Sequence, residues 1–381
     1  MAVALGLTAA GATAVGLAGP RPTDTLSGLP VHEPLTTPAA ASGPRGQLPD
    51  AGPPGLGRGT GGVNEALAAA PVEPKQRGVA LGMFAEDVSF SYVPLLKEIA
   101  ALGATHVALI VPLYQTNGRA TDLALHTRFS PTLELIADTV RAARREHLEV
   151  TLFPIIRLTH PAPGEWRGTL APSHPDLWFR AYRDLLGDLA AVAAQTGATR
   201  LVVGSELSSL DGELDRWRPL LERIRGIFPG HLIYSANWDH YRQAALFELV
   251  DEEGVVAYFN LRDDARAPST EAALQNAWRR HQDELLRWHA GHRRPLLFTE
   301  VGYRSRAGST AAPWDEGPGG TPDLDEQRRG FAAFRQVWAK NPALDGAYVW
   351  NWYGFGGPSS VGYTPRGKPA AQEVRRLLQE L

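Results

Sequence analysis

Short apolar runs alternate with longer amphipathic runs from about Gly78 to the end of the chain. The short runs have the length of strands, and the longer ones repeat apolar residues at the spacing of one helix face. The expected strands are Val79–Phe84, His106–Val111, Val150–Ile156, Arg200–Gly204, Leu232–Ser235, Val255–Tyr258, Pro295–Thr299 and Ala347–Trp350. The expected helices between them include Tyr92–Ala101, Leu133–Glu146, Asp176–Gln195, Leu214–Ile227, Glu271–Trp288 and Leu324–Trp338. This alternation over residues 77–381 predicts a single (β/α)8 TIM barrel.

An open, doubly wound sheet is the alternative arrangement of such a pattern. That fold normally carries a glycine-rich phosphate-binding turn after its first strand. Here the first expected strand is followed by Ala85-Glu86-Asp87, which is not such a turn. The barrel is therefore favoured.

The first 76 residues have a different composition from the barrel region. Residues 1–20 contain no charged side chain and resemble the apolar part of a secretory signal, so a signal or an N-terminal membrane anchor is expected. Residues 20–76 contain 11 Pro and 9 Gly, which predicts a disordered linker over 21–76. Positive charge comes from 34 Arg and only 4 Lys, which together with abundant Ala and Gly is typical of GC-rich bacterial genomes. We therefore expect an exported bacterial protein.

Composition excludes several classes of function. The chain has no cysteine, which excludes disulfides, cysteine-ligated zinc and thiol catalysis. A formal net charge of −3 argues against nucleic acid as a main partner. The histidines form no HExxH pattern and no close ligand set, so neither a metal nor a cofactor is expected. No protein partner is predicted.

Two glutamates follow buried strands at equivalent places. Glu206 comes directly after the fourth strand and Glu300 after the seventh. In a barrel these two strands lie across the mouth, where catalytic residues gather, so their end residues can face each other over a cleft. Two facing carboxyl groups are what the hydrolysis of a glycosidic bond requires. Helix capping or pairing with arginine is the structural alternative for each.

These stretches resemble the clan A retaining glycoside hydrolases, and within them glycoside hydrolase family 113, the β-1,4-mannanases. The similarity is carried by Gly204-Ser205-Glu206, by Glu300–Ser309 and by Gly367-Lys368-Pro369-Ala370, in that order along the barrel. The resemblance implies that Glu206 is the acid/base and Glu300 the nucleophile. It also implies a tyrosine beside the nucleophile, which matches Tyr258, and a tryptophan under the reacting sugar, which matches Trp350.

Aromatic and polar residues near other strand ends are the candidate sugar contacts. Pyranose rings pack on aromatic faces, and their hydroxyl groups need fixed hydrogen-bonding partners. Residues 350 and 352 alternate and would point the same way on a strand. Besides Tyr258 and Trp350, the candidate substrate-binding residues are Asn237, Arg157, His160, Trp166 and Trp352. Ordinary loop or core structure is the alternative for each.

The sequence therefore predicts a retaining endo-β-glycanase, most similar to β-1,4-mannanases, acting on a β-linked oligo- or polysaccharide by double displacement. Two alternatives remain open. A non-catalytic barrel would bind a glycan without turnover, and a transglycosylase would use the same two glutamates. A carboxylate buried in an arginine pair would favour the binding protein.

Overall fold

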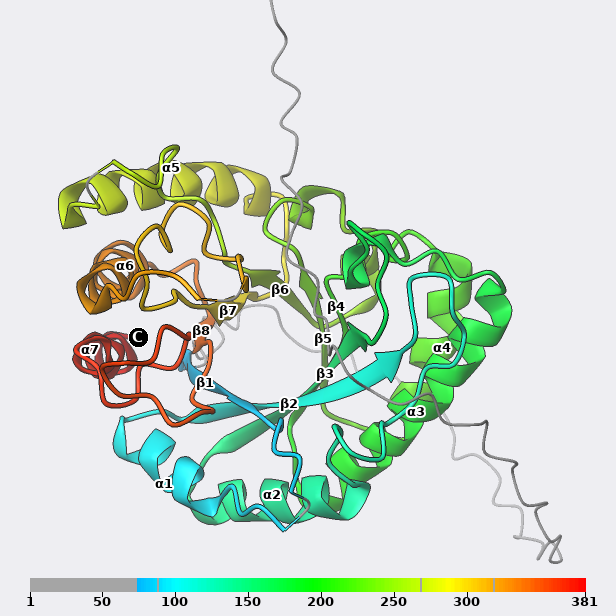
Figure 1. The fold of residues 1–381 in the computed structure, drawn as a ribbon. Coiled ribbons are helices and arrows are strands. Elements are labelled where there is room, and N and C mark those ends of the chain that lie inside the picture. Colours follow the sequence, from blue (N-terminus) through cyan, green and yellow to red (C-terminus); the bar gives the residue numbers. More distant parts are fainter. Residues whose placement is uncertain (1–73, 88, 268, 318) are drawn as a thin grey trace, which may run out of the picture. The chain divides into compact units, whose positions relative to one another are not determined.

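Eight parallel strands close into a barrel in chain order, from β1 to β8 (Figure 1). The computed structural model describes residues 74–87, 89–267, 269–317 and 319–381. The strands are β1 Gln76–Gly82, β2 His106–Gln115, β3 Glu149–Leu158, β4 Arg200–Ser205, β5 His231–Ala236, β6 Glu252–Val256, β7 Leu296–Val301 and β8 Gly346–Val349. Pairing of β1 with β8 completes the ring and confirms the predicted barrel over the open sheet.

The predictions for the N-terminal segments lie almost entirely outside the described residues. The signal-like segment 1–20 and the linker up to residue 73 belong to that part. The first described strand begins at Gln76, where the predicted linker ends. None of the helices in the described part of the chain has both the length and the apolar character that crossing a membrane requires.

Seven α-helices surround the barrel. They are α1 Val93–Ala101, α2 Leu133–Arg145, α3 Pro175–Thr196, α4 Leu214–Arg225, α5 Glu271–His289, α6 Leu324–Trp338 and α7 Ala370–Glu380. Each of the six helices expected from the sequence is confirmed, with its ends within two residues. Local chemistry fixes several of these ends. Thr132, Thr270 and Asp323 each accept a first-turn amide with the side chain, and Gly197 ends α3 in a left-handed conformation.

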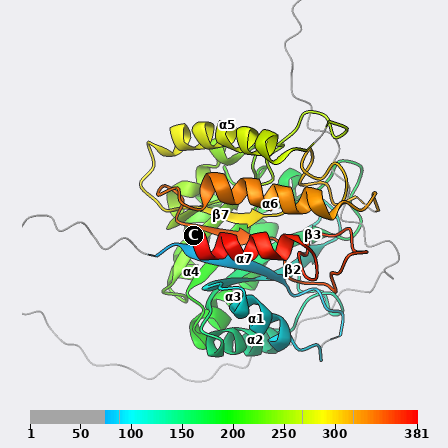
Figure 2. The same cartoon turned by 90° about the vertical axis from the view of Figure 1, so that its left-hand side faces the viewer.

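The unit between β5 and β6 has no α-helix. Two short 3-10 helices, Tyr241–Gln243 and Ala245–Leu249, occupy its place. Helices α5, α6 and α7 lie next to one another along the outside of the barrel (Figure 2). These helices follow the strands whose ends carry Tyr258, Glu300 and Trp350.

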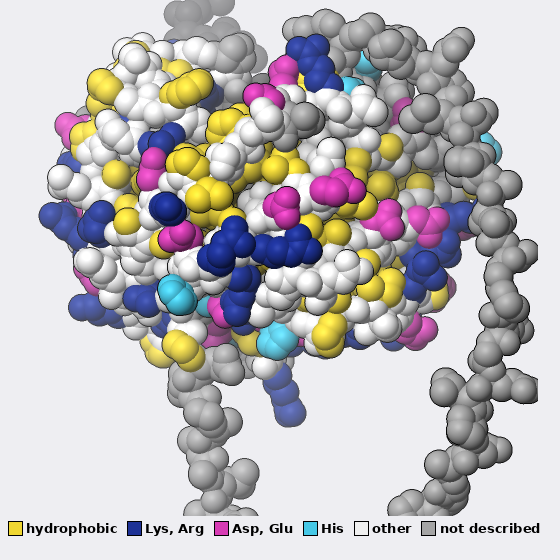
Figure 3. Space-filling view, turned by 90° about the horizontal axis from the view of Figure 1, so that it is seen from below, with side chains coloured by type: hydrophobic (Ala, Val, Ile, Leu, Met, Phe, Trp, Pro, Cys, Tyr) yellow, Lys and Arg dark blue, Asp and Glu magenta, His cyan; other side chains and the backbone are white. Residues whose placement is uncertain are grey.

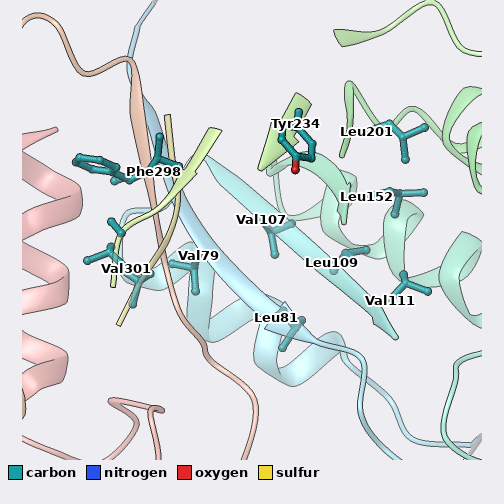
Figure 4. Close-up of a cluster of buried hydrophobic side chains, with 14 of the residues drawn as sticks. Val79, Leu81, Val107, Leu109, Val111, Leu152, Leu201, Tyr234, Phe298 and Val301 are labelled. Carbon is teal, nitrogen blue, oxygen red and sulfur yellow. The ribbon is translucent and has the colours of Figure 1, made fainter. Parts of the chain in front are cut away.

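Strand alternation divides the apolar residues between two cores. Val79, Leu81 and Val107 belong to the outer core, which lies between the strands and the helices (Figure 4). Their neighbours Ala80 and Ala108 belong to the inner core, which fills the barrel itself. Burial on both faces explains why these strands read as continuous apolar runs in the sequence.

Strand pairing is irregular at three places near the mouth of the barrel. The register shifts between β4 and β5 at Val202/Gly204, between β6 and β7 at Val255/Val256, and between β7 and β8 at Phe298/Val301. Such irregularities redirect side chains and are common beside active sites. Here they affect the strands that precede or contain the two candidate carboxyl groups.

Candidate active site

A pocket opens at the carboxyl ends of the strands. It brings together five residues that the sequence singled out, namely Glu206, Glu300, Tyr258, Trp350 and Trp166. They come from five different β/α units of the barrel. Its other lining residues are Ile156, Leu158, Pro161, Glu165, Arg167, Trp314 and Glu316.

Glu206 follows the last residue of β4 and is held in an unusual backbone conformation. Its φ of 54° is in the left-handed region, which residues with a side chain seldom adopt. The amide of Glu206 donates to the carbonyl of Ser235 on β5 at 2.7 Å, which fixes this conformation. The side chain is only 2% exposed and forms an ion pair with Arg167.

Glu300 lies within β7 and is as deeply buried as Glu206. The Tyr258 hydroxyl, two residues beyond β6, donates to Oε2 of Glu300 at 3.0 Å. The other carboxyl oxygen, Oε1, is buried and makes no hydrogen bond with any residue that the structure describes. That oxygen is therefore available to a ligand or to a proton.

Burial, followed by the nearby charge of Glu206, raises the pKa of Glu300 to about 8. The Arg167 guanidinium and the hydrogen bond from Tyr258 act in the opposite direction and lower that pKa. Two buried carboxyl groups this close cannot easily both be ionised. Burial and the neighbouring carboxyl group therefore favour the protonated form of Glu300, while Glu206 pairs with Arg167.

Two tryptophans form aromatic walls of the pocket, and hydrogen bonds hold the segment that carries one of them. Trp350 is the first residue after β8 and is 6% exposed. Trp166 and Arg167 come from the segment after β3, which Glu165 anchors by accepting the amides of Ala162 at 2.9 Å and Gly118 at 3.2 Å. Flat apolar faces beside buried carboxyl groups suit a pyranose ring.

A second pocket adjoins the first. The two share Arg167, Glu316 and Trp350. Arg157, predicted as a sugar contact, lines the second pocket from β3, and its guanidinium lies 5.7 Å from the ring centre of Phe84. The other lining residues are Phe84, Ile155, Arg304, Asn351, Gly362 and Tyr363.

Three predicted contacts lie outside the lining of these pockets. Trp352 is buried in the outer core, and its indole Nε1 donates to Glu98 on α1 at 2.8 Å. Asn237 is buried and donates to Asp239. His160 is exposed, and its Nδ1 lies 3.0 Å from the Thr159 hydroxyl. The expectation that Trp352 points the same way as Trp350 is wrong, because β8 ends at Val349 and strand alternation does not extend past it.

Sequence reasoning did not identify four residues of the cleft individually, namely Glu316, Trp314, Arg304 and Tyr363. Glu316 and Trp314 belong to the long segment between β7 and α6, where no periodic pattern points to a position. The feature of the sequence that points to Arg304 is its position four residues after Glu300. Arg167 directly follows the predicted contact Trp166, but nothing in its spacing indicates that it reaches Glu206.

Asp211, Tyr234 and His240 form a polar cluster that does not line the pocket. Oδ2 of Asp211 accepts the Tyr234 hydroxyl at 3.1 Å and lies 3.0 Å from Nε2 of His240. Burial raises the pKa of Asp211. No group of three or more His, Asp or Glu side chains in the described part of the chain could hold a metal ion.

Comparison with known proteins agrees with this geometry. The sequence pattern of glycoside hydrolase family 113 matches residues 81–355. The fold is similar to that of a family 113 β-mannanase from Alicyclobacillus acidocaldarius, with a TM-score of 0.71 and 24% identity over 80% of this chain and 97% of that one. A second family 113 β-1,4-mannanase gives a TM-score of 0.70 at 19% identity, over 80% and 99% of the two chains.

A more distant barrel is a family 5 enzyme from Streptomyces cattleya, solved with Manβ1-4GlcNAc, with a TM-score of 0.54 and 16% identity over 81% of this chain and 80% of that one. No curated protein sequence matches the chain. The family match spans more than half of the chain and includes both glutamates of the pocket. The chain therefore belongs to glycoside hydrolase family 113, in clan A, and is a glycoside hydrolase.

Proposed function

We propose that the protein cleaves β-1,4-linked mannan internally, by double displacement with retention of configuration. Glu300 attacks the anomeric carbon while Glu206 protonates the leaving oxygen, which gives a covalent glycosyl–enzyme and a shortened glycan. Glu206 then takes a proton from water, which attacks the same carbon and releases Glu300. Each step breaks one C–O bond and forms another.

The observation that carries this proposal is the pair of buried glutamates in one pocket, with Tyr258 bound to only one of them. A neutral tyrosine hydroxyl stabilises the negative charge that Glu300 needs as a nucleophile. Burial and the charge of Glu300 raise the pKa of the Tyr258 hydroxyl, so it stays a donor at alkaline pH. Oε1 of Glu300 makes no hydrogen bond to a described residue and is the oxygen left for the anomeric carbon.

The proposed reaction requires a proton on Glu206 and a negative charge on Glu300, whereas the ligand-free surroundings of Glu300 favour its protonated form. Arg167 links the two states, because it pairs with Glu206 and also lowers the pKa of Glu300. When a sugar displaces the guanidinium of Arg167 from Glu206 toward Glu300, the proton follows to the carboxyl group that lost its counter-ion. The number of protons on the pair does not change.

Mannan as the substrate rests on the family and on its solved members. Two solved proteins with a similar fold are a β-mannanase and a β-1,4-mannanase of this family. Trp350 and Trp166 offer the aromatic faces that a pyranose ring needs. The two pockets share three lining residues, so the cleft extends past the two carboxyl groups, which favours internal cleavage.

A non-catalytic glycan-binding barrel is the second candidate, and the Arg167–Glu206 ion pair favours it. A carboxyl group held by an arginine is a poor proton donor, so a site that kept this pair on binding sugar would not turn over. In that protein, substitution of Glu206 would weaken glycan binding, and no product would form with the wild type.

The test is hydrolysis of β-mannan, mannooligosaccharides and other β-glycans by the wild type, Glu206→Gln and Glu300→Gln. Glu253→Gln is a matched control, since Glu253 is an equally buried carboxyl group paired with His292 outside the pocket. We expect mannan cleavage by wild type and control, a loss of at least about 10³-fold in both pocket variants, and the β-anomer as first product. An α-anomer, or full activity in Glu300→Gln, would contradict the mechanism.

The same experiment separates the alternatives. Products longer than the starting oligosaccharide would show transglycosylation by the same two residues. Binding of mannooligosaccharides without any product, in the wild type, would favour the non-catalytic protein. An aryl mannoside with a good leaving group should still be cleaved by Glu206→Ala, because it needs no proton for the first step.

A further inference from the structure

The net charge of the residues that line the cleft changes sign from the first pocket to the second. The charged residues that line the first pocket are Glu165, Glu206, Glu300, Glu316 and Arg167. Those that line the second pocket are Arg157, Arg167, Arg304 and Glu316. Four carboxyl groups therefore face one guanidinium in the first pocket, whereas three guanidiniums face one carboxyl group in the second. The second pocket keeps a positive balance even when Glu206, the partner of Arg167, is added to it.

Arg304 is the arginine that accounts for this excess. It lies three residues after β7 and is 8% exposed, yet it forms no ion pair with any described carboxylate. Its guanidinium is held by backbone carbonyls, with Nε donating to Val361 at 3.2 Å and Nη1 to Asp315 at 3.4 Å. Its second terminal nitrogen, Nη2, makes no hydrogen bond with a residue in the described part of the chain.

Several other arginines of the barrel pair with acidic side chains. On the face seen from below in Figure 1, Lys and Arg side chains lie among Asp and Glu side chains (Figure 3). Two arginines with little exposed side-chain area are examples, since Arg200 pairs with Glu252 at 3.0 Å and Arg262 with Glu326 at 2.6 Å. Burial and then the neighbouring Arg306 lower the pKa of Arg304, although Tyr363, Asp315 and Glu316 act in the opposite direction. A buried charge of this kind is costly unless something pairs with it.

We propose that the second pocket binds a sugar residue carrying an anionic group, a carboxylate or a phosphate ester, and that Arg304 and Arg157 contact that anion. The planar guanidinium fork matches the oxygens of both groups. Tyr363 and Trp350, which line the same pocket, offer ring faces to the sugar that carries the charge. The inference deepens the proposed function, on which it rests for the identity of the glycan: the substrate is an acidic β-glycan.

The test measures glycan binding to the Glu300→Gln variant by calorimetry, so that no product forms. The probes are neutral β-1,4-mannooligosaccharides and oligosaccharides of equal length with one uronic acid residue or one phosphorylated mannose. We expect an acidic probe to bind about tenfold more tightly at low salt, because a charge-assisted contact replaces a neutral one. That advantage should shrink as the salt concentration rises. The better of the two acidic probes identifies the anion.

Arg304→Gln and Arg157→Gln, each combined with Glu300→Gln, should remove most of the preference for the acidic probe. Arg306→Gln is the matched control. Arg306 donates to the Gly317 carbonyl, as Arg304 does, and pairs with Asp315, but it does not line the pocket. The control should change the affinities for neutral and acidic probes by the same factor.

Equal binding of neutral and acidic probes, or no binding of acidic probes up to millimolar concentration, would overturn the inference. Equal effects of Arg304→Gln and Arg306→Gln on the preference would also overturn it. The proposed hydrolysis can fail separately: a wild type that cleaves no glycan, but binds acidic probes in a way that depends on Arg304, keeps the anion site and loses the enzymatic reaction.

Discussion

At the scale of single residues, the chemistry of the pocket depends on what surrounds two identical side chains. Glu206 and Glu300 have the same exposure, but one pairs with Arg167 and the other accepts a tyrosine hydroxyl. The sequence identified both carboxyl groups. It could not assign the proton, because the pKa of Glu300 depends on the distances to Glu206, Arg167 and Tyr258 in the folded chain.

Replacing Glu300 with glutamine should stabilise the protein at alkaline pH. The pKa of this carboxyl group is raised from 4.5 to about 8 by folding, so stability is lost as the pH rises through that window. We expect Glu300→Gln to raise the free energy of unfolding by roughly 1–2 kcal/mol at pH 8 and to change it little at pH 4.5. Urea unfolding at the two pH values measures this. A variant that is less stable than wild type at pH 8 would contradict the raised pKa.

Removing the Tyr258 hydroxyl should move the alkaline limb of the pH–rate profile. The pair needs one proton, so kcat/KM should fall as the pH rises past about 8. The hydrogen bond from Tyr258 lowers the pKa of Glu300, so Tyr258→Phe should shift this limb to higher pH and reduce kcat/KM by about tenfold or more. Tyr363→Phe, whose hydroxyl binds the Pro313 carbonyl, should leave the position of the limb unchanged. A limb that moves to lower pH in Tyr258→Phe would contradict this assignment.

At the scale of elements, the segment between β7 and α6 illustrates how a long loop is fixed. Its described residues form neither a helix nor a named strand, yet it supplies Trp314 and Glu316 to the pocket. Glu326, in the first turn of α6, accepts the amides of Gly308 at 3.0 Å and Thr310 at 2.8 Å. The buried Arg262 pairs with the same carboxylate. The Glu326 carboxylate, which belongs to the following helix, therefore holds this loop in place.

Substitution of Glu326 should loosen this loop. Glu326→Gln leaves the buried guanidinium of Arg262 without its counter-ion, so the free energy of unfolding should fall by about 3 kcal/mol. KM should rise as well, because Trp314 and Glu316 lose their support. Asp325→Asn, in the same helical turn but on an exposed ion pair with Arg328, should cost no more than about 0.5 kcal/mol. Equal losses in the two variants would show that the carboxylate of Glu326 does not hold the loop.

At the scale of the whole barrel, closure depends on close contact between the first and last strands. Gly78 on β1 pairs with Tyr348 on β8, and a Cβ atom at Gly78 would lie 2.3 Å from the tyrosine ring. The ring cannot move away easily, since its hydroxyl donates to Gln76 at 2.7 Å and lies 3.1 Å from the Thr151 hydroxyl. Only glycine therefore fits at position 78, in the seam where β1 pairs with β8 and closes the barrel.

Two glycine-to-alanine substitutions should have opposite effects on stability. Gly78→Ala should lower the free energy of unfolding by about 1–3 kcal/mol through overpacking at the seam. Gly187→Ala, in the interior of α3, places its Cβ in ordinary contact with Ile227 at 3.9 Å. It should raise stability by about 0.5–1 kcal/mol, because alanine favours the helix and restricts the unfolded chain. The melting temperatures of the two variants measure the difference, and a stabilised Gly78→Ala would disprove a tight seam.

The sequence by itself determined the barrel and the two carboxyl groups at its mouth. Hydrophobic periodicity is a local property that burial imposes directly, so strand and helix positions followed from it within a few residues. The strand ends then identified Glu206, Glu300 and Trp350, because a residue directly after a barrel strand lies at the mouth of the barrel, where active sites are found.

Only the tertiary structure decided which other side chains reach the cleft. Arg304, Glu316 and Tyr363 come from segments without a regular pattern, and their positions depend on contacts distant in the sequence. Trp352 turned toward Glu98, since strand alternation ends with the strand. The proton on Glu300 and the positive end of the cleft likewise arise from charges that folding brings together, and electrostatic interaction depends on distance in space rather than along the chain.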